Sequence, residues 1–149
     1  MENTVVRSWL KNPLLNQRVL IVEDQLLIAL DLQESISESS IGADVVGFAS
    51  QTEHALRLAP TVDIAFVDVN LSDGRTGPEI GRILAEKFGV TVIFMTANPE
   101  ALGEGVPGTL GVISKPVSGV SVEEALAFAI ARRTDQLAVM PSAMRLFNA

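Results

Sequence analysis

The stretch "AFVDVNLSDG", residues 65–74, joins a hydrophobic run to a carboxylate and then to a turn. Residues 64–67 are apolar and have the character of an interior strand, and Asp68 follows where that strand should end. A polar Ser-Asp-Gly turn then occupies residues 72–74. A carboxylate in such a place either caps the turn or performs chemistry, and the rest of the chain distinguishes the two.

Five short apolar runs recur along the chain, and each is followed by a segment of helical character. The runs comprise residues 18–22, 44–50, 62–69, 90–96 and 110–114. The first, third and fourth are nearly continuous in Val, Ile, Leu and Phe, which is typical of strands covered on both faces. The sequence therefore predicts an α/β fold, in which a doubly wound parallel sheet of five strands carries helices on both faces.

The segments between these runs carry recognisable helix signals. The predicted helices comprise residues 25–38, 51–59, 77–88 and 119–133. In the last of them, Ser121 with Glu124 three residues later fits a capping box. The segment 97–111 instead contains four glycines and two prolines. We therefore expect the fourth helix to be short, with one or two turns at 99–103, or disordered.

Composition and charge exclude several classes of protein. A chain of 149 residues without cysteine forms one domain that lacks disulfides and thiolate metal sites, and its single histidine excludes a multi-histidine metal cluster. With 18 acidic against 11 basic residues, the net charge of −7 disfavours direct contact with nucleic acid. No apolar run approaches the roughly 18 residues of a membrane span, and the N-terminus lacks the features of a secretion signal. We expect a cytoplasmic protein.

Polar side chains follow four of the predicted strands at their carboxyl ends, where open α/β sheets form their functional crevice. Glu23 and Asp24 follow the first run, and Asp68 lies at the end of the third. Thr96 ends the fourth run and is followed by the apolar Ala97, and Ser114 ends the fifth and is followed by Lys115 and Pro116. Each pair of carboxylates about 4 Å apart would cost on the order of 4 kcal/mol at an effective dielectric constant near 20. One lysine cannot offset this repulsion, so a bound dication is the simplest explanation. Oxygen ligands alone suit Mg²⁺ or Mn²⁺, and Asn70 could add a main-chain carbonyl.

Each of these residues also has an ordinary structural interpretation. Asp24 could cap a helix, Asp68 could cap a turn, and Lys115 could form an ion pair with either of them. For a single residue this interpretation is preferred. For five residues at the ends of four strands, we favour a functional site.

The motifs resemble those of the receiver domains of two-component response regulators, over roughly residues 18–133. The matching segments are "VLIVED" at 19–24, "DVNLSDGRTGPE" at 68–79, "VIFMTAN" at 92–98 and "ISKPV" at 113–117. The resemblance implies a flavodoxin-like strand order 2-1-3-4-5. It also implies that Asp68 accepts a phosphoryl group from a sensor histidine kinase or a histidine phosphotransfer protein. The chain would then catalyse only its own phosphoryl transfer and dephosphorylation.

The resemblance also implies the role of each site residue. Glu23, Asp24, Asp68 and the Asn70 carbonyl would hold Mg²⁺. Thr96, Ala97 and Lys115 would bind or respond to the phosphoryl group.

Two features depart from the usual receiver pattern. Val112 occupies the position three residues before Lys115, where receivers usually carry the Tyr or Phe of their conformational switch. The segment "VIFMTANPEAL" is similar to an atypical subfamily whose fourth strand reads Phe-Ala-Thr-Gly, although here residues 94–97 read Phe-Met-Thr-Ala.

The resemblance also predicts the domain organisation. We expect an N-terminal extension at 1–17, a receiver domain at 18–133 and a tail at 134–149 without an output domain. Such a stand-alone receiver would signal through a protein partner, and it could also form a homodimer.

Three alternative functions share some of these sequence features. A degenerate receiver could serve only as a protein-binding module. A Mg²⁺-dependent phosphohydrolase with an aspartyl-phosphate intermediate needs a second aspartate as general acid two residues after the nucleophile, where Asn70 stands. A nucleotide-binding flavodoxin-like protein would need a glycine-rich loop after the first strand, which "VEDQLL" does not provide.

Overall fold

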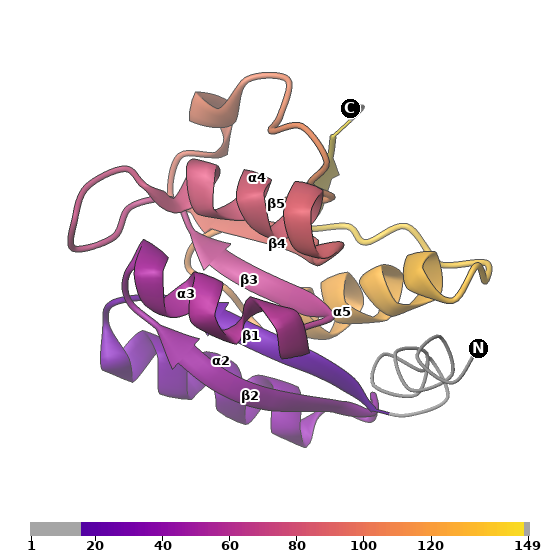
Figure 1. Ribbon diagram of the computed structural model, residues 1–149. Helices are drawn as coiled ribbons and strands as arrows, with labels where there is room; N and C mark the ends of the chain where they lie inside the picture. Colours follow the sequence, from indigo (N-terminus) through magenta and orange to yellow (C-terminus); the bar gives the residue numbers. More distant parts are fainter. Residues whose placement is uncertain (1–15, 148–149) are drawn as a thin grey trace, which may run out of the picture.

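Six strands form one sheet in the order β2-β1-β3-β4-β5-β6 (Figure 1). The computed structural model describes residues 16–147. The strands are β1 (Gln17–Val22), β2 (Ala43–Ala49), β3 (Ile64–Asp68), β4 (Thr91–Thr96), β5 (Gly111–Ser114) and β6 (Met144–Leu146). The first five run parallel, whereas β6 pairs antiparallel with β5.

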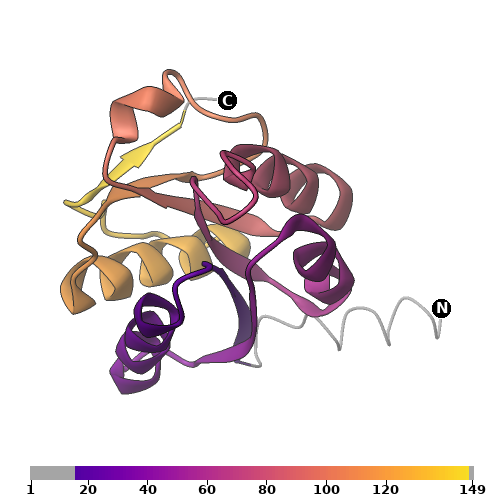
Figure 2. The ribbon, with the colours of Figure 1, turned by 90° about the vertical axis from the view of Figure 1, so that its left-hand side faces the viewer.

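Helices cover both faces of the sheet (Figure 2). They are α2 (Leu26–Glu38), α3 (Thr52–Leu58), α4 (Gly77–Phe88) and α5 (Gly119–Arg133), together with the 3₁₀ helices η1 (Ala59–Thr61) and η2 (Pro99–Leu102). Helices α3 and α4 lie on one face, and α2 and α5 lie on the other. Within residues 16–147, no helix combines the length and the apolar character needed to cross a membrane.

The central strands are buried because successive side chains point to opposite faces, and each face has helices over it. In β3, Ala65 and Val67 pack toward α3 and α4, whereas Ile64 and Phe66 pack toward α2 and α5. All four side chains are fully buried. The continuous apolar runs in the sequence thus reflect two separate hydrophobic cores, one on each side of the sheet.

The sheet differs from the sequence prediction in having a sixth strand. Residues 144–146 fall within the predicted C-terminal tail, yet they pair with Gly111, Val112 and Ile113 at the open edge of β5. The sheet is therefore not purely parallel, and part of the predicted tail belongs to it. Of the predicted N-terminal extension, residues 1–15 lie outside the described part of the chain.

The start of α5 also corrects the predicted capping box. Ser118, and not Ser121, is the N-cap, because its side chain accepts a hydrogen bond from the Ser121 backbone N–H at 3.1 Å. The Ser121 hydroxyl in turn accepts from the Ser118 N–H at 3.1 Å, so Ser121 takes the reciprocal position expected for Glu124. Glu124 instead accepts hydrogen bonds from the backbone and hydroxyl of Ser142 in the tail.

The glycine- and proline-rich segment between β4 and β5 forms little regular structure. Its one helical element among the described residues is η2, which spans four residues. Gly103 follows with a positive φ of 55°, and turns continue to β5.

Candidate functional site

Three carboxylates meet at the carboxyl ends of β1 and β3. The two strands pair Val22 with Val67, so Glu23 and Asp68 follow at the same level of the sheet. Asp24 comes next in the chain, and one carboxylate oxygen from each of the three residues lies within 4.8 Å of the others. Glu23 and Asp68 are buried, whereas Asp24 is exposed. The structure therefore brings together the three predicted acidic residues.

Lys115 connects two of these carboxylates. Its Nζ donates hydrogen bonds to Asp68 Oδ2 at 2.8 Å and to Glu23 Oε1 at 3.0 Å. The lysine side chain reaches them from the residue after β5, on the far side of β4 in the strand order. The predicted lysine therefore neutralises Asp68 directly, without a mediating group.

Burial and hydrogen bonding act in opposite directions on the pKa values of Glu23 and Lys115, and the net effect is a raised pKa in both. Burial, with a further contribution from the Asp68 charge, raises the pKa of Glu23, although hydrogen bonds from the Gln25 N–H and Lys115 oppose that rise. For Lys115, burial acts against the charged form, but the hydrogen bonds to Asp68 and Glu23 outweigh it, so its pKa is raised. The ammonium therefore stays charged at neutral pH.

The other predicted site residues lie around this cluster. The Asn70 backbone N–H donates to Asp68 Oδ1 at 3.2 Å, which places the loop after β3 against the carboxylate. Thr96 ends β4, is buried, and accepts a hydrogen bond from the Asn98 N–H at 3.1 Å through its hydroxyl oxygen. Ala97 and Lys115 both line a cavity of about 360 Å³ between β4, α2 and the start of α5.

The backbone after Asp68 is held close to the start of α4. The Gly77 N–H donates to the Val69 carbonyl at 3.1 Å. A Cβ atom on Gly77 would lie 2.0 Å from the Asp68 carbonyl oxygen, which is too close for any side chain. Glycine at this position thus allows α4 to begin directly against the strand that carries Asp68.

Val112 lies away from the carboxylates. It is 1% exposed and belongs to the hydrophobic core on the α3 and α4 side, together with Phe94, Leu102 and Val106. Phe147 from the tail packs against this same core. The position that is usually aromatic in receivers is therefore a small core residue here, and an aromatic ring reaches this core from the end of the chain.

Three side chains near the site make contacts that the sequence did not predict. Arg75, Arg145 and Phe147 contact the segment around η2, either by hydrogen bonds or by packing. The alternation of Met144 and Leu146 with Arg145 between them is a short β-type pattern that could have indicated a strand. Nothing in the sequence shows which edge such a strand would join.

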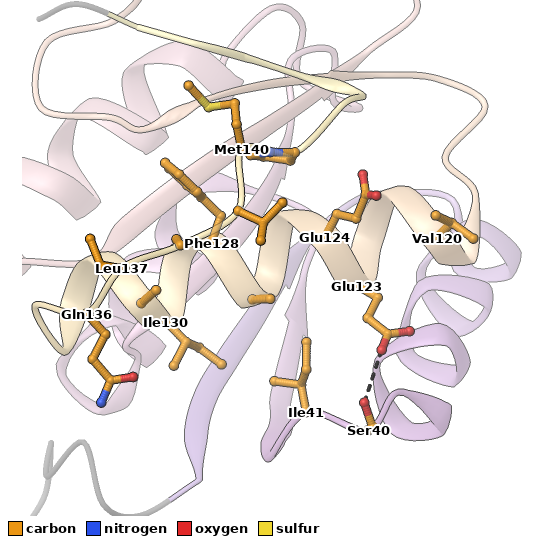
Figure 3. Close-up of a pocket in the computed structure, with 15 residues that line it drawn as sticks. Ser40, Ile41, Val120, Glu123, Glu124, Phe128, Ile130, Gln136, Leu137 and Met140 are labelled. Atoms are coloured by element: carbon orange, nitrogen blue, oxygen red, sulfur yellow. Dashed lines mark hydrogen bonds between the residues drawn. The ribbon is translucent and has the colours of Figure 1, made fainter.

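A second groove lies between α5 and the tail (Figure 3). Its volume is about 600 Å³, and apolar side chains such as Phe128 and Met140 line it. At its rim the Ser40 hydroxyl donates a hydrogen bond to Glu123. It carries none of the predicted site residues.

The arrangement at the strand ends defines its chemical capability. Three carboxylate oxygens within 4.8 Å of one another form a donor set that suits a hard divalent cation. A buried aspartate with a lysine at hydrogen-bond distance and a hydroxyl on the neighbouring strand suits transfer of an anionic group, which requires positioning and charge neutralisation.

Comparison with known proteins points to one family. The family model described as the response regulator receiver domain matches residues 19–127. Among curated proteins, the chain is similar to the phyllosphere-induced regulator PhyR of Methylorubrum extorquens AM1, with 32% identity over 116 residues. That match covers 75% of this chain and 43% of the relative, so the chain spans less than half the length of this curated relative.

Two solved structures resemble the fold closely. The solution structure of the receiver domain of Erythrobacter litoralis PhyR has a TM-score of 0.70 at 27% identity, and covers 85% of this chain and 98% of that one. The crystal structure of PhyR from Brucella abortus also has a TM-score of 0.70 at 27% identity. It covers 90% of this chain and 57% of that one.

Proposed function

The chain belongs to the response regulator receiver domain family, and on this premise we propose that it accepts a phosphoryl group on Asp68 and signals to a protein partner. The observation that carries this proposal is the position of the Asp68 carboxylate. It ends β3, lies 2.8 Å from Lys115 Nζ, and shares a cluster with Glu23 and Asp24. A turn cap would need none of these neighbours.

The donor is a phosphohistidine of a sensor histidine kinase or of a histidine phosphotransfer protein. An Asp68 carboxylate oxygen attacks phosphorus, the phosphorus–nitrogen bond breaks, and its electron pair returns to the imidazole, which takes up a proton. Hydrolysis of the resulting acyl phosphate restores the carboxylate and releases inorganic phosphate. The protein needs to supply only alignment and charge neutralisation for both steps.

The donor set fits Mg²⁺, because it consists of oxygen atoms. One of its members, Asp24, is exposed to solvent, so an ion held there could keep water molecules as further ligands. Glu23, Asp24 and Asp68 would hold the ion, with the Asn70 main-chain carbonyl as a further ligand. Bound there, Mg²⁺ would offset the negative charge that gathers between Asp68 and the incoming phosphoryl group.

Two side chains from neighbouring strand ends complete the site. Lys115 already contacts Asp68, so its ammonium would follow the new phosphoryl oxygens with little movement. Thr96 would turn its hydroxyl toward another phosphoryl oxygen. Ala97 follows it at the strand end and lines the neighbouring cavity together with Lys115. Movement of Thr96 would disturb the Asn98 N–H that now bonds to it and would thereby alter the segment 98–109.

This segment is the proposed switch in a receiver of the atypical, PhyR-like type. Its four-residue η2 helix and its glycines with positive φ make it the least regular connection in the described sheet. Two charge-assisted hydrogen bonds at roughly 1.5–3 kcal/mol each are enough to shift a nearly balanced equilibrium.

The experiment is intact mass spectrometry after incubation with acetyl phosphate, with and without Mg²⁺. We expect a gain of one phosphoryl group that depends on Mg²⁺ in the wild type, is absent in Asp68→Asn, and persists in the control Asp73→Asn, which changes an exposed aspartate of the same loop. A gain that survives Asp68→Asn would place the acceptor elsewhere. If acetyl phosphate and a phosphorylated histidine phosphotransfer protein both left the mass unchanged, the chain would be a binding module only.

A further inference from the structure

The tail strand β6 covers an edge of the sheet that would otherwise be open. Met144–Leu146 pairs antiparallel with Gly111–Ile113 of β5, and the Phe147 N–H extends the pairing to the Leu110 carbonyl at 3.0 Å. An open strand edge presents unpaired backbone groups and is a ready place for another extended segment to bind. The chain's own tail occupies that place here.

The same strand holds the η2 segment. The Arg145 guanidinium donates to the Gly103 carbonyl and to the Pro99 carbonyl, each at 2.8 Å. A second arginine, Arg75 from the loop after β3, donates to the Ala101 carbonyl at 3.0 Å. Figures 1 and 2 show the tail strand beside this segment. Backbone carbonyls along η2 are therefore bound by arginines from two different parts of the chain.

Phe147 strengthens this attachment from the other side. Its ring lies 6.4 Å from the Phe94 ring, centroid to centroid, and Arg145 stacks over it at 5.3 Å. Gly105 has a φ of +122°, and a Cβ there would lie 2.5 Å from the Phe147 ring. The segment after η2 thus passes directly against the ring, which packs on the core that contains Val112. The tail therefore contributes an aromatic ring to the core that contains Val112.

A hydrogen bond links this assembly to the candidate phosphorylation site. The Thr96 hydroxyl oxygen accepts from the Asn98 N–H, and Asn98 immediately precedes η2. A Thr96 hydroxyl that turns toward a phosphoryl oxygen would release this N–H. The backbone carbonyls of Pro99 and Gly103 would then no longer be held where Arg145 binds them.

The rest of the tail is attached weakly enough to leave. Between α5 and β6 the chain runs back along α5, where Leu137, Val139 and Met140 are exposed (Figure 3). Glu124 holds this stretch through its hydrogen bonds to Ser142. A strand of three residues at the edge of the sheet, preceded by an exposed stretch, opens at a lower free-energy cost than the buried central strands.

We propose that residues 144–147 form a displaceable strand that holds η2 while Asp68 is unmodified, and that an extended segment of a partner protein pairs with β5 in its place after phosphorylation. The trigger rests on the proposed function. The partner segment would run antiparallel to β5 and place an aromatic residue against Phe94, where Phe147 packs now. It would need no arginine, because phosphorylation moves the carbonyls that Arg145 binds.

The hold on η2 can be tested without any phosphoryl group, by hydrogen exchange on the full chain. We expect Arg145→Ala to accelerate amide exchange in residues 99–105 and 110–113 by about tenfold, because the strand and the segment lose their mutual contacts. Arg57→Ala, which removes an exposed arginine from α3, serves as the matched control and should leave these rates unchanged. Equal rates in Arg145→Ala and wild type would overturn the proposal.

The displacement is tested by hydrogen exchange after acetyl phosphate and Mg²⁺, with intact mass measured on the same sample. We expect exchange in residues 144–147 to rise by about tenfold in the phosphorylated wild type, and to rise less in Thr96→Ala. A chain phosphorylated on Asp68 whose tail stays protected would overturn the displacement alone. A chain that takes up no phosphoryl group would overturn the proposed function and, with it, the trigger.

Partner binding is tested with a fluorescent peptide of residues 141–147 that carries alanine at the position of Arg145, added in trans. We expect it to bind the phosphorylated chain at least about fivefold more tightly than the unmodified chain, because the peptide does not depend on the η2 carbonyls, whereas the attached tail has lost its Arg145 contacts and competes less at high effective concentration. A peptide with a further alanine at the position of Phe147 is the control. Equal affinity for both forms of the protein, or for both peptides, would contradict an exchangeable strand.

Discussion

The Lys115 ammonium lies 2.8 Å from Asp68 Oδ2, and the same ammonium lies 3.0 Å from Glu23 Oε1. One cation therefore serves two carboxylates that are almost completely buried. Asp24, the exposed third member, receives no hydrogen bond from Lys115 within the described contacts. When all four groups are charged, two negative charges remain uncompensated, which is the charge that a divalent cation would neutralise.

Mg²⁺ should therefore stabilise the fold. At a concentration 100-fold above its dissociation constant, the gain is about 2.7 kcal/mol. For a chain of this length this corresponds to roughly 3–4 °C in the thermal midpoint per kcal/mol. We expect Asp24→Asn to lose most of this shift and Glu53→Gln, an exposed acidic residue on α3, to keep it. Differential scanning calorimetry with and without Mg²⁺ measures the shift, and a midpoint that does not respond would refute the metal assignment.

Lys115→Ala tests whether Lys115 compensates the charge of the buried carboxylates without being needed for metal binding. Without the ammonium, Glu23 and Asp68 face each other buried and uncompensated, so we expect the metal-free protein to lose about 2 kcal/mol of unfolding free energy. Mg²⁺ should still bind and should recover part of the loss, because the carboxylate ligands remain. Urea unfolding at several Mg²⁺ concentrations measures both effects.

We expect Lys115→Ala to be phosphorylated less efficiently than the wild type, or to lose the structural response to phosphorylation. Complete loss of the Mg²⁺ effect in Lys115→Ala would show that the lysine organises the metal ligands, which contradicts this division of roles.

Gly77→Ala tests the close approach of α4 to the strand end that carries Asp68. A Cβ would lie 2.0 Å from the Asp68 carbonyl oxygen and 2.7 Å from Val69 Cα, so backbone must move. We expect a loss of about 2–3 kcal/mol and slower phosphorylation of Asp68 by acetyl phosphate. Gly119→Ala is the matched control, since Gly119 also begins a helix and its nearest contact would be 3.8 Å away. Equal effects of the two substitutions would rule out the steric explanation.

The sequence predicted the central strands and the proximity of the three carboxylates, because both depend on local patterns. The apolar runs that contain Ile64–Val67 and Val92–Met95 have no alternation, so they identify strands covered on both faces, and each ends next to a polar residue. Parallel strands then bring these ends to one edge of the sheet, whatever the details of packing. The composition of the segment 97–111 likewise predicted that any helix there would be short.

The features that the sequence did not predict depend on contacts between distant residues. Strand β6 has three residues and follows Pro141, so its alternation is too short to be distinguished from a loop. Ser118 and Ser121 both fit the start of a helix, and the true cap is decided by the backbone of residue 118, which is extended with a ψ of 159°. The binding of Arg145 to the η2 carbonyls follows from the three-dimensional arrangement alone.

The end of the sheet opposite the candidate site offers a separate test of stability. The buried Asp63 carboxylate accepts a hydrogen bond from the Arg18 N–H at 2.9 Å and lies 3.6 Å from the Arg133 guanidinium. Arg133 in turn donates to the Gly89 carbonyl and the Thr91 hydroxyl, each at 3.0 Å, and burial lowers its pKa. This one arginine therefore ties the end of α5 to β3 and to the start of β4.

Arg133→Ala should cost about 3 kcal/mol of unfolding free energy, because it leaves a buried carboxylate without its cation. Its neighbour Arg132 is exposed and lies over the Phe128 ring, 5.7 Å from the centroid, so Arg132→Ala should cost no more than about 1 kcal/mol. Both variants should keep the thermal shift with Mg²⁺ and the phosphorylation of Asp68, since they lie at the other end of the strands. Urea denaturation of the two variants decides the point: equal losses would mean that the Asp63 carboxylate is stabilised by the Arg18 N–H and solvent, without a contribution from Arg133.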